Sequence, residues 1–286
     1  MKRESRSSES GMQSRRKRGD WRSMTLRSVS RKAAAMRLGI ISDIHGNLLA
    51  LESVLAALDA AGIDRLICLG DVVGYGPDPI ECLDLVFDRD AVMVIGNHEE
   101  AMLRPEIAKS FRDVAREAIE WTSRRIQALR PDLIECIERL PGMVYLESDL
   151  MLVHDSPIPG GRRYLLNEAA AAPAFRGVDT SICLVGHTHL PGCFRRRDGD
   201  RDATVESRPG SPGVSVELES DARYILNPGS VGQPRDGDPR AAYAILDLED
   251  RAISWRRAGY DIPAAQSRAL ASGLPARAAE RLALGA

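Results

Sequence analysis

From residue 36 onward, short apolar segments alternate with longer segments that have the periodicity of helices. The sequence predicts strands at residues 38–42, 65–69 and 91–95, and helices between them at residues 48–61 and 80–87. Because the connections between these segments are short, the strands are predicted to run parallel and to be joined by right-handed crossovers.

The second half of the chain is richer in strands. Helices are expected at residues 109–129 and 131–140, a hairpin at 143–146 and 150–153, strands at 181–185, 192–196, 214–218, 224–226, 241–248 and 252–257, and C-terminal helices at 262–272 and 275–284. The polar segment 197–212 is predicted to be a surface hairpin or loop, with a substrate-selecting lid as the alternative. The simplest architecture is a single α/β domain, residues 36–286, with two packed sheets and helices outside.

The first 35 residues differ in composition from the rest of the chain. Residues 1–36 contain eleven Lys or Arg and only three acidic residues, and they lack the apolar core of a secretory signal. A disordered extension, an Arg/Ser-rich organelle presequence and a start codon placed too early all fit this composition. Because Met36 directly precedes the first expected strand, we prefer a dispensable or wrongly assigned tail.

The formal net charge of −2 conceals this uneven distribution, since residues 37–286 carry −10. An acidic domain is a poor general binder of nucleic acids, because affinity for phosphate backbones requires a cationic surface. No apolar run approaches the roughly 18 residues that a membrane span needs. Five cysteines without a C-x-x-C pair indicate reduced thiols. We therefore expect a cytoplasmic protein that binds neither membranes nor nucleic acids in general.

All five histidines lie in short polar motifs that directly follow apolar segments. These motifs are S-D-I-H-G-N at 42–47, G-N-H-E at 96–99, L-V-H-D at 152–155 and G-H-T-H at 186–189, and L-G-D at 69–71 is placed in the same way. A lone histidine or a lone G-D is more often structural, but loops at the carboxyl ends of strands in an open α/β sheet converge to form sites. Imidazole with carboxylate and amide oxygen is a ligand set for divalent metals.

Seven side chains in these motifs are candidate metal ligands: Asp43, His45, Asp71, Asn97, His154, His187 and His189. Because seven exceeds the four ligands of one tetrahedral site, two metal ions fit the set better than one. The absence of a thiolate favours Mn²⁺, Fe or Ni, and Zn²⁺ is compatible with the same ligands.

The order D-x-H, G-D, G-N-H, H, G-H-x-H resembles the calcineurin-like metallophosphoesterases, over about residues 36–262. Within that superfamily, residues 70–79 and 227–235 resemble the group of bacterial and archaeal phosphodiesterases related to YfcE. The resemblance implies a four-layer αββα sandwich of two mixed β-sheets flanked by helices. It also implies hydrolysis of a small phosphodiester or phosphomonoester by a metal-bridging hydroxide.

The same resemblance assigns the ligands to two ions. Asp71 would bridge them, with Asp43, His45 and His189 on one ion and Asn97, His154 and His187 on the other. His98, next to a ligand, would donate a proton to the leaving group as a general acid. The alternative is that His98 only orients a ligand.

Three positions depart from the related Ser/Thr protein phosphatases or from common patterns in the superfamily. Gly74 and Tyr75 stand where those phosphatases have an Asp that orients the acid and an Arg that binds phosphate, so protein-phosphatase activity is not expected. Glu99 stands where many relatives have Asp, which keeps a carboxylate but moves it. Arg235 is a candidate replacement for the phosphate clamp, or a surface residue, and the surrounding Pro and Gly are most simply a tight turn.

Two other classes of function are weighed against a phosphoesterase. One is a phosphate-ester-binding or scaffold member of the superfamily that has lost catalysis, against which the complete ligand set and His98 argue. The other is a dinuclear hydrolase of amides, whose ligand sets generally lack the G-N-H and G-H-x-H combination. The natural substrate and the oligomeric state do not follow from the sequence.

Overall fold

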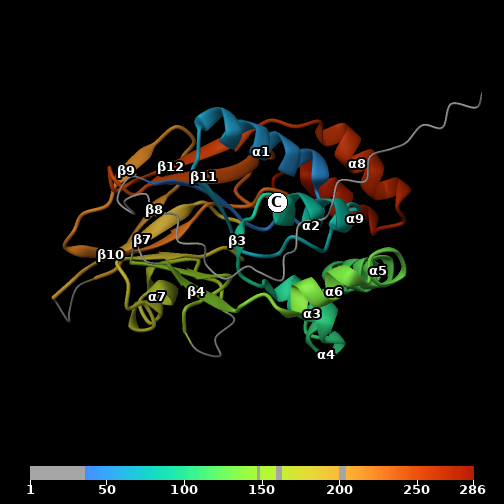
Figure 1. Cartoon of the computed structure of the whole chain (residues 1–286), viewed down its shortest axis with the longest axis horizontal. Coiled ribbons are helices and arrows are strands. Elements are labelled where there is room, and N and C mark those ends of the chain that lie inside the picture. The colour runs from blue at the N-terminus through green and yellow to red at the C-terminus, as the bar shows by residue number, and fades with distance from the viewer. Residues whose placement is uncertain (1–35, 147–148, 159–162, 200–203) are drawn as a thin grey trace, which may run out of the picture. The chain divides into compact units, whose positions relative to one another are not determined.

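Two mixed six-stranded sheets form the centre of the molecule (Figure 1). The computed structural model describes residues 36–146, 149–158, 163–199 and 204–286. The first sheet has the order β3-β2-β1-β11-β12-β9 and the second the order β4-β5-β6-β10-β7-β8. With helices on the outside, this arrangement is the four-layer sandwich that the resemblance implied.

The first sheet contains the parallel strands that the alternating pattern predicted. Its members are β1 (Arg37–Ile41), β2 (Arg65–Cys68), β3 (Val92–Met93), β9 (Ser215–Glu217), β11 (Ala241–Asp247) and β12 (Ala252–Ala258). Strands β1, β2 and β3 are parallel, whereas β11 pairs antiparallel with β1. The carboxyl ends of β1, β2 and β3 therefore lie at one edge of this sheet.

The second sheet is formed by later segments of the chain. Its members are β4 (Met143–Leu146), β5 (Leu150–Val153), β6 (Ile182–Leu184), β7 (Gly192–Arg197), β8 (Glu206–Pro209) and β10 (Ala222–Asn227). Strands β4 and β5 pair antiparallel, as the predicted hairpin requires. Strand β6 pairs parallel with both β5 and β10, and β7 pairs antiparallel with β10. Strand β8 pairs antiparallel with β7, so the described part of the polar segment 197–212 contributes an edge strand.

The helices flank the sheets. They are α1 (Leu48–Ala61), α2 (Pro79–Asp88), α3 (Asn97–Leu103), α4 (Pro105–Ala108), α5 (Asp113–Leu129), α6 (Asp132–Glu138), α7 (Glu168–Ala171), α8 (Ile262–Ala271) and α9 (Ala276–Glu280), with 3-10 turns η2 (Ala174–Arg176) and η3 (Arg281–Ala283). Helix α1 has the predicted bounds because Asn47 caps its first turn and Gly62, at φ 67°, ends it.

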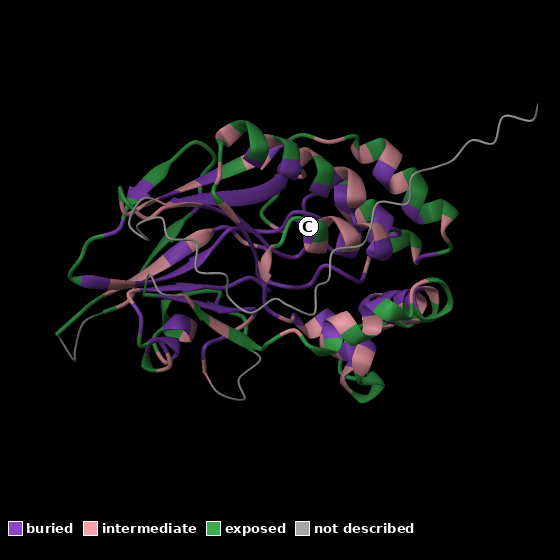
Figure 2. Cartoon of the chain, viewed as in Figure 1, coloured by how far each residue is buried: buried purple, intermediate pink, exposed green. Residues whose placement is uncertain are grey.

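Three hydrophobic clusters separate the layers, and strand periodicity explains them. Successive side chains of a strand point to opposite faces. In β5, Leu150 and Leu152 pack between the two sheets, whereas Met151 and Val153 face the outer layer that contains Phe175. In β1, Ile40 likewise faces the second sheet. Figure 2 shows the result, with buried residues along the sheets and on the inward sides of the helices.

Helix α3 was not predicted, and it begins directly at Asn97. The helix has seven residues, and its first three belong to the polar motif. Its apolar pattern is therefore too short to predict a helix. Residues 1–35, for which the sequence suggested a dispensable tail, lie outside the described residues, so this remains a prediction.

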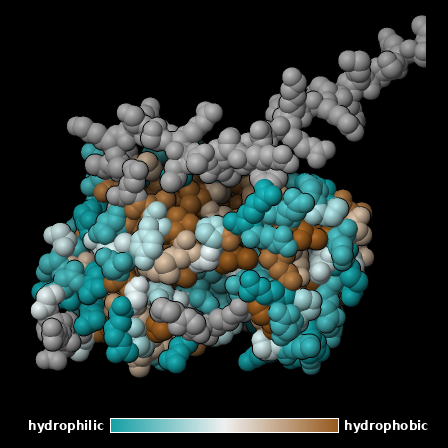
Figure 3. Space-filling model, turned by 60° about the horizontal axis from the view of Figure 1, so that its bottom comes forward, coloured by the Kyte–Doolittle hydropathy of each residue, from teal (hydrophilic) through white to brown (hydrophobic). Residues whose placement is uncertain are grey.

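Hydrophilic side chains cover much of the face shown in Figure 3, and hydrophobic ones gather in a band across its middle. No helix in the described part of the chain combines the length and the apolar character that a membrane span requires. Two large aromatic side chains are well exposed, Tyr145 on the edge strand β4 and Tyr164 in the loop after β5.

Candidate metal centre

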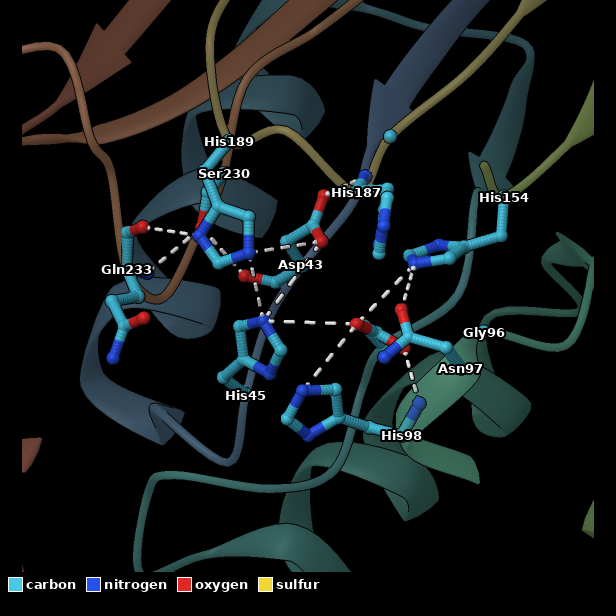
Figure 4. Close-up of polar contacts among 12 residues, drawn as sticks. Asp43, His45, Gly96, Asn97, His98, His154, His187, His189, Ser230 and Gln233 are labelled. Carbon is cyan, nitrogen blue, oxygen red and sulfur yellow. Dashed lines mark hydrogen bonds and ion pairs between the residues drawn. The ribbon is translucent and has the colours of Figure 1, made fainter. Parts of the chain in front are cut away.

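The polar motifs from both sheets meet at one place in the molecule (Figure 4). Asp43 and His45 follow β1, Asp71 follows β2, and Asn97 begins α3 directly after β3. The second sheet supplies His154 after β5, and His187 and His189 after β6. Six of these seven side chains are buried and Asn97 is half-buried, so the site lies inside the fold, between the ends of the two sheets.

In the described part of the chain, three groups of side chains at this place have ligand atoms close enough to share a metal ion. They are Asp43 with His45 and His189, Asp71 with His154 and His187, and His45 with Asp71 and His98. The first group contains the three side chains that the resemblance assigned to one ion, and the second contains Asp71 with two of the three assigned to the other ion. The third group shows that His98 lies as close to Asp71 as the candidate metal ligands do. The sequence did not predict this closeness.

Asp71 lies between the two halves of the site. Its Oδ2 is 3.3 Å from Nε2 of His154 and 3.9 Å from Nε2 of His45. Its other oxygen, Oδ1, accepts a hydrogen bond of 2.8 Å from the backbone N–H of His98. One oxygen is thus fixed by the backbone and the other faces histidines from both sheets, which is the position that a bridging carboxylate needs.

Asp43 is held in a similar way. Its Oδ2 accepts a hydrogen bond of 3.1 Å from the backbone N–H of His187. Its Oδ1 is fully buried, has no hydrogen-bond partner among the described residues, and lies 3.3 Å from Nε2 of His189. A buried carboxylate oxygen without a donor is costly unless a cation lies beside it.

Backbone carbonyls orient three of the histidines. Nδ1 of His45 lies 3.0 Å from the carbonyl of Val73, Nδ1 of His154 lies 2.7 Å from that of Leu69, and Nδ1 of His189 lies 2.5 Å from that of Gln233. A carbonyl accepts but cannot donate, so each Nδ1 carries the proton. In a neutral ring this leaves the lone pair on Nε2, the atom that faces the centre of the site.

The donor set fits a metal ion on this structure's own geometry. Nε2 of His45 and Nε2 of His189 face one another at 3.2 Å, although both carry lone pairs in the tautomer that their carbonyl partners impose. Two lone pairs cannot form a hydrogen bond and repel each other unless a cation binds both. Two nitrogen ligands on one ion, with bonds of about 2.1 Å, are separated by about 3 Å when the bonds are near right angles.

The ionisation of the histidines is consistent with this role. Burial lowers the pKa of His187 to about 3 and that of His45 well below its usual value, so both rings are neutral at pH 7. Burial also opposes a charge on His154, but the carboxylate of Asp71 outweighs it and raises the pKa of His154 to about 10. The ring of His154 is therefore protonated at pH 7 when no metal ion is bound. A metal ion at this position would compete with that proton.

The backbone at the site is held in an uncommon conformation. Nine non-glycine residues in the described part of the chain have positive φ, and six of them line this site: Asp43, His45, Asp71, Tyr75, His187 and His189. Such conformations cost about 1–3 kcal/mol each and persist only where the surroundings enforce them. The Asp and His residues of D-x-H and the two His residues of G-H-x-H are therefore positioned by the main chain as well as by their side chains.

Glu99 holds the backbone of the loop after β2 in place, a role that the sequence did not reveal. Its side chain is fully buried, and its carboxylate accepts four backbone N–H groups, from Asp71, Val72, Val73 and Gly96, at 2.7–3.0 Å. These bonds join the loop after β2 to the start of α3. Asp71 and Asn97 are consequently fixed relative to each other by a residue that faces neither metal position.

The segment 227–235 holds the loops after β1 and β6 in place, so it is more than a tight turn. Ser230 donates to the carbonyl of Asp43 at 2.7 Å, and the backbone N–H of Gly232 donates to the same carbonyl at 3.0 Å. Asn227 donates to the carbonyl of Gly186 at 2.6 Å, and the Gln233 carbonyl orients His189. The density of Gly and Pro in this segment was the signal in the sequence for close packing. Glycine is needed at position 232, because a Cβ there would lie 1.8 Å from the carbonyl oxygen of Ile44.

His98 lies next to the candidate ligands, and no carboxylate in the described part of the chain bonds to its Nδ1. Its Nε2 is 3.9 Å from Oδ2 of Asp71, and its buried Nδ1 has no hydrogen-bond partner among the described residues. Nδ1 faces Gly74, where a Cβ would lie only 2.2 Å away. The ring packs against Tyr75 and Phe111, with centroid distances of 4.9 and 5.2 Å. Burial lowers its pKa to about 4, so His98 is neutral at pH 7 in the free site.

Comparison with known proteins relates this site to a family. A profile of the calcineurin-like phosphoesterase superfamily domain matches residues 36–251. The chain is 34% identical over 254 residues to the uncharacterised protein MJ0912 of Methanocaldococcus jannaschii, covering 87% of this chain and 98% of that protein. It is 26% identical over 213 residues to the phosphodiesterase YfcE of Escherichia coli, covering 74% of this chain and 88% of that protein.

A solved structure shows the same fold. The crystal structure of a metallophosphoesterase from Sphaerobacter thermophilus has a TM-score of 0.76 and 40% sequence identity, and the match covers 88% of this chain and 100% of that one. The matched profile includes the parallel strands of both sheets and every motif from Asp43 to His189.

Proposed function

Because the chain belongs to the calcineurin-like phosphoesterase superfamily, we propose that it hydrolyses phosphodiester bonds with the help of two divalent metal ions. The family is metal-dependent, and one relative carries the name phosphodiesterase. The substrate would be a small phosphoester. The described cysteines are unpaired, which agrees with a reducing, cytoplasmic location.

The observation that carries the proposal is the pair of Nε2 atoms of His45 and His189 at 3.2 Å, beside the unpartnered Oδ1 of Asp43. Two nitrogen lone pairs and a carboxylate oxygen converge there, with no proton donor between them among the described residues. This arrangement is stable around a cation and unfavourable without one.

Seven side chains would hold the two ions. Asp43, His45 and His189 would hold one ion and Asn97, His154 and His187 the other, with Asp71 in contact with both. When bound, such ions lower the pKa of water to generate a nucleophile and neutralise charge on phosphoryl oxygens. Since every donor is oxygen or imidazole nitrogen, we propose Mn²⁺ as the native ion.

His98 would act as the proton donor to the leaving group. Its Nε2 points into the space beside Asp71, and no other unassigned histidine is present, since the chain has five. The ring is neutral in the free site, so this role requires that a bound phosphoester restore the proton. Tyr75, whose ring contacts both His45 and His98 at 4.9 Å, would keep water from the donor.

The test is hydrolysis of bis(p-nitrophenyl) phosphate by protein loaded with Mn²⁺. We expect turnover that a chelator abolishes and that returns when Mn²⁺ is added. An amide, p-nitroacetanilide, should not be cleaved. Protein that binds two Mn²⁺ ions but cleaves neither bis(p-nitrophenyl) phosphate nor p-nitrophenyl phosphate would be a binding member of the superfamily, and cleavage of the amide alone would show another hydrolase class.

A further inference from the structure

His187 differs from the other histidines among the candidate ligands in how its ring is held. Nδ1 of His45, of His154 and of His189 each faces a backbone carbonyl at 2.5–3.0 Å. Within the described part of the chain the ring of His187 has no such partner, and the hydrogen bond of this residue is the one from its backbone N–H to Asp43. A hydrogen bond therefore selects neither the orientation nor the tautomer of the His187 ring.

The ring of His187 is held by aromatic contacts instead. Tyr164 stacks on it, with ring centroids 4.2 Å apart and an angle of 18° between the planes. His154 contacts it edge-on, with centroids 5.3 Å apart and an angle of 70°, and Figure 4 shows these two histidines side by side. Rotation of the imidazole out of its plane would break the stacking, so the phenol ring of Tyr164 fixes this plane.

The stacking matters because His187 lies at the rim of the site. Its exposed fraction is 9%, whereas His45, His154 and His189 are 1–3% exposed. Tyr164 is 48% exposed, so its ring lies at the surface of the molecule, on top of the imidazole. Without the phenol ring, one face of His187 would be open to water and the imidazole would be free to turn away from the metal centre.

The loop that carries Tyr164 has its own anchor in the fold. The next residue, Leu165, is buried and belongs to the same hydrophobic cluster as Phe175, Val153 and Val185. The two valines lie directly before the motifs that contain the two histidines of the second position. Tyr164 is therefore attached to the same strand ends that carry these candidate ligands, which fits a side chain with a fixed place over the metal centre.

We propose that Tyr164 is a positioning residue for the metal centre, and that its ring holds the imidazole of His187 by stacking in the orientation that the second ion needs. This inference rests on the proposed function, because it concerns the ion that Asn97, His154 and His187 would hold. Stacking uses the aromatic ring and not the hydroxyl group, and it acts at one of the two metal positions. Loss of a group that orients a metal-binding histidine typically weakens metal binding by about 10–100-fold, and we expect the lower end of this range for a stacking contact.

The first test is metal binding without catalysis. Protein freed of metal by a chelator is titrated with Mn²⁺ in a calorimeter. We expect wild type to bind two ions, Tyr164→Ala to bind one of them about tenfold more weakly, and Tyr164→Phe to bind both like wild type. Tyr145→Ala is the matched control, since Tyr145 is also exposed but lies on β4 without a ring contact to a candidate ligand among the described residues.

Three results would overturn the proposal. They are wild-type affinity for both ions in Tyr164→Ala, equal weakening in the Ala and Phe variants, and no binding of Mn²⁺ by wild type. Circular dichroism of each variant shows that it is folded, and the Phe variant keeps the comparison informative where the Ala variant is unstable.

The second test is a double-mutant cycle that shows whether Tyr164 acts through His187. In protein that carries His187→Ala, the further change Tyr164→Ala should alter Mn²⁺ affinity by less than about twofold, because the ring that Tyr164 positions is gone. In protein that carries His45→Ala, at the other metal position, the same change should still weaken binding about tenfold. A tenfold loss in both backgrounds would assign Tyr164 to the stability of its loop and overturn the proposal.

Hydrolysis of bis(p-nitrophenyl) phosphate by the same proteins separates this inference from the proposed function. Mn²⁺ binding that depends on the ring of Tyr164, without hydrolysis by wild type, would contradict the phosphodiesterase proposal and leave the role of Tyr164 supported. Hydrolysis by wild type together with equal Mn²⁺ affinities of wild type and Tyr164→Ala would do the reverse.

Discussion

The carboxylate of Glu99 accepts a hydrogen bond of 2.8 Å from the backbone N–H of Asp71, and it accepts three more from neighbouring backbone groups. Through these contacts, a residue that faces neither metal position fixes the loop that carries the candidate bridging ligand. The site therefore depends on a buried carboxyl group outside its own ligand set.

Replacement of Glu99 by Gln should be strongly destabilising. The amide NH₂ would face backbone donors that now bond to a carboxylate oxygen, which leaves buried N–H groups without acceptors. We expect a loss of about 3 kcal/mol or more in the free energy of unfolding. Urea denaturation measures it. The exposed Glu106→Gln is the control and should change stability by less than about 0.5 kcal/mol. A Glu99→Gln protein as stable as this control would contradict the role of the four bonds.

Asp71→Asn should remove metal from both positions at once. The change is isosteric, but the amide lacks the charge that Oδ2 presents to His45 and His154. We expect loss of activity and less than one bound ion per chain, whereas His45→Ala, at one end of the site, should keep partial occupancy. Inductively coupled plasma mass spectrometry gives the metal content. Two ions per chain in Asp71→Asn would refute the bridging position.

His98→Ala separates proton donation from ligand positioning. A general acid contributes most when the leaving group is a strong base, and nitrophenolate departs nearly unaided. We expect kcat to fall by roughly 10²–10⁴-fold on alkyl or nucleoside diesters and clearly less on nitrophenyl diesters. The backbone N–H that bonds to Oδ1 of Asp71 remains in the variant, so the metal content should stay at the wild-type value. Equal losses on both substrates would assign His98 to positioning.

Gly74→Ala tests the placement of the His98 ring. A Cβ at Gly74 would lie 2.2 Å from Nδ1 of His98, and its φ of 86° is also unfavourable for Ala. We expect displacement of the ring and a loss of at least tenfold in kcat with metal content retained. Gly62→Ala is the control, because Gly62 also has positive φ but open space around it. If both variants lose only stability, the contact with His98 has no part in catalysis.

The features that the sequence predicted are local ones. The apolar segments before Asp43, Asp71 and His154 define strands by themselves, and each polar motif follows its strand within a few residues. Convergence of the motifs within each sheet follows from the parallel direction of β1, β2 and β3 in one sheet and of β5 and β6 in the other. Fold class and candidate ligands could therefore be inferred from short windows of sequence.

What the sequence did not reveal depends on contacts between distant segments. Ser230 bonds to Asp43 across 187 positions, and β1 pairs with β11, which lies about 200 residues later. Glu99 was recognised as an unusual residue, but its four partners are backbone groups, which have no signature in the sequence.

The positive φ of the ligand positions limits how this site can change during evolution. Asp, Asn and His are the non-glycine residues that best tolerate the left-handed region, whereas β-branched residues are strongly disfavoured there. Asp43 and Asp71 can therefore drift to Asn with no cost to the backbone, although each such step removes a charge from the centre. A descendant that loses catalysis would be expected to keep its fold and carry Asn at these positions, so inactivation would leave stability largely intact.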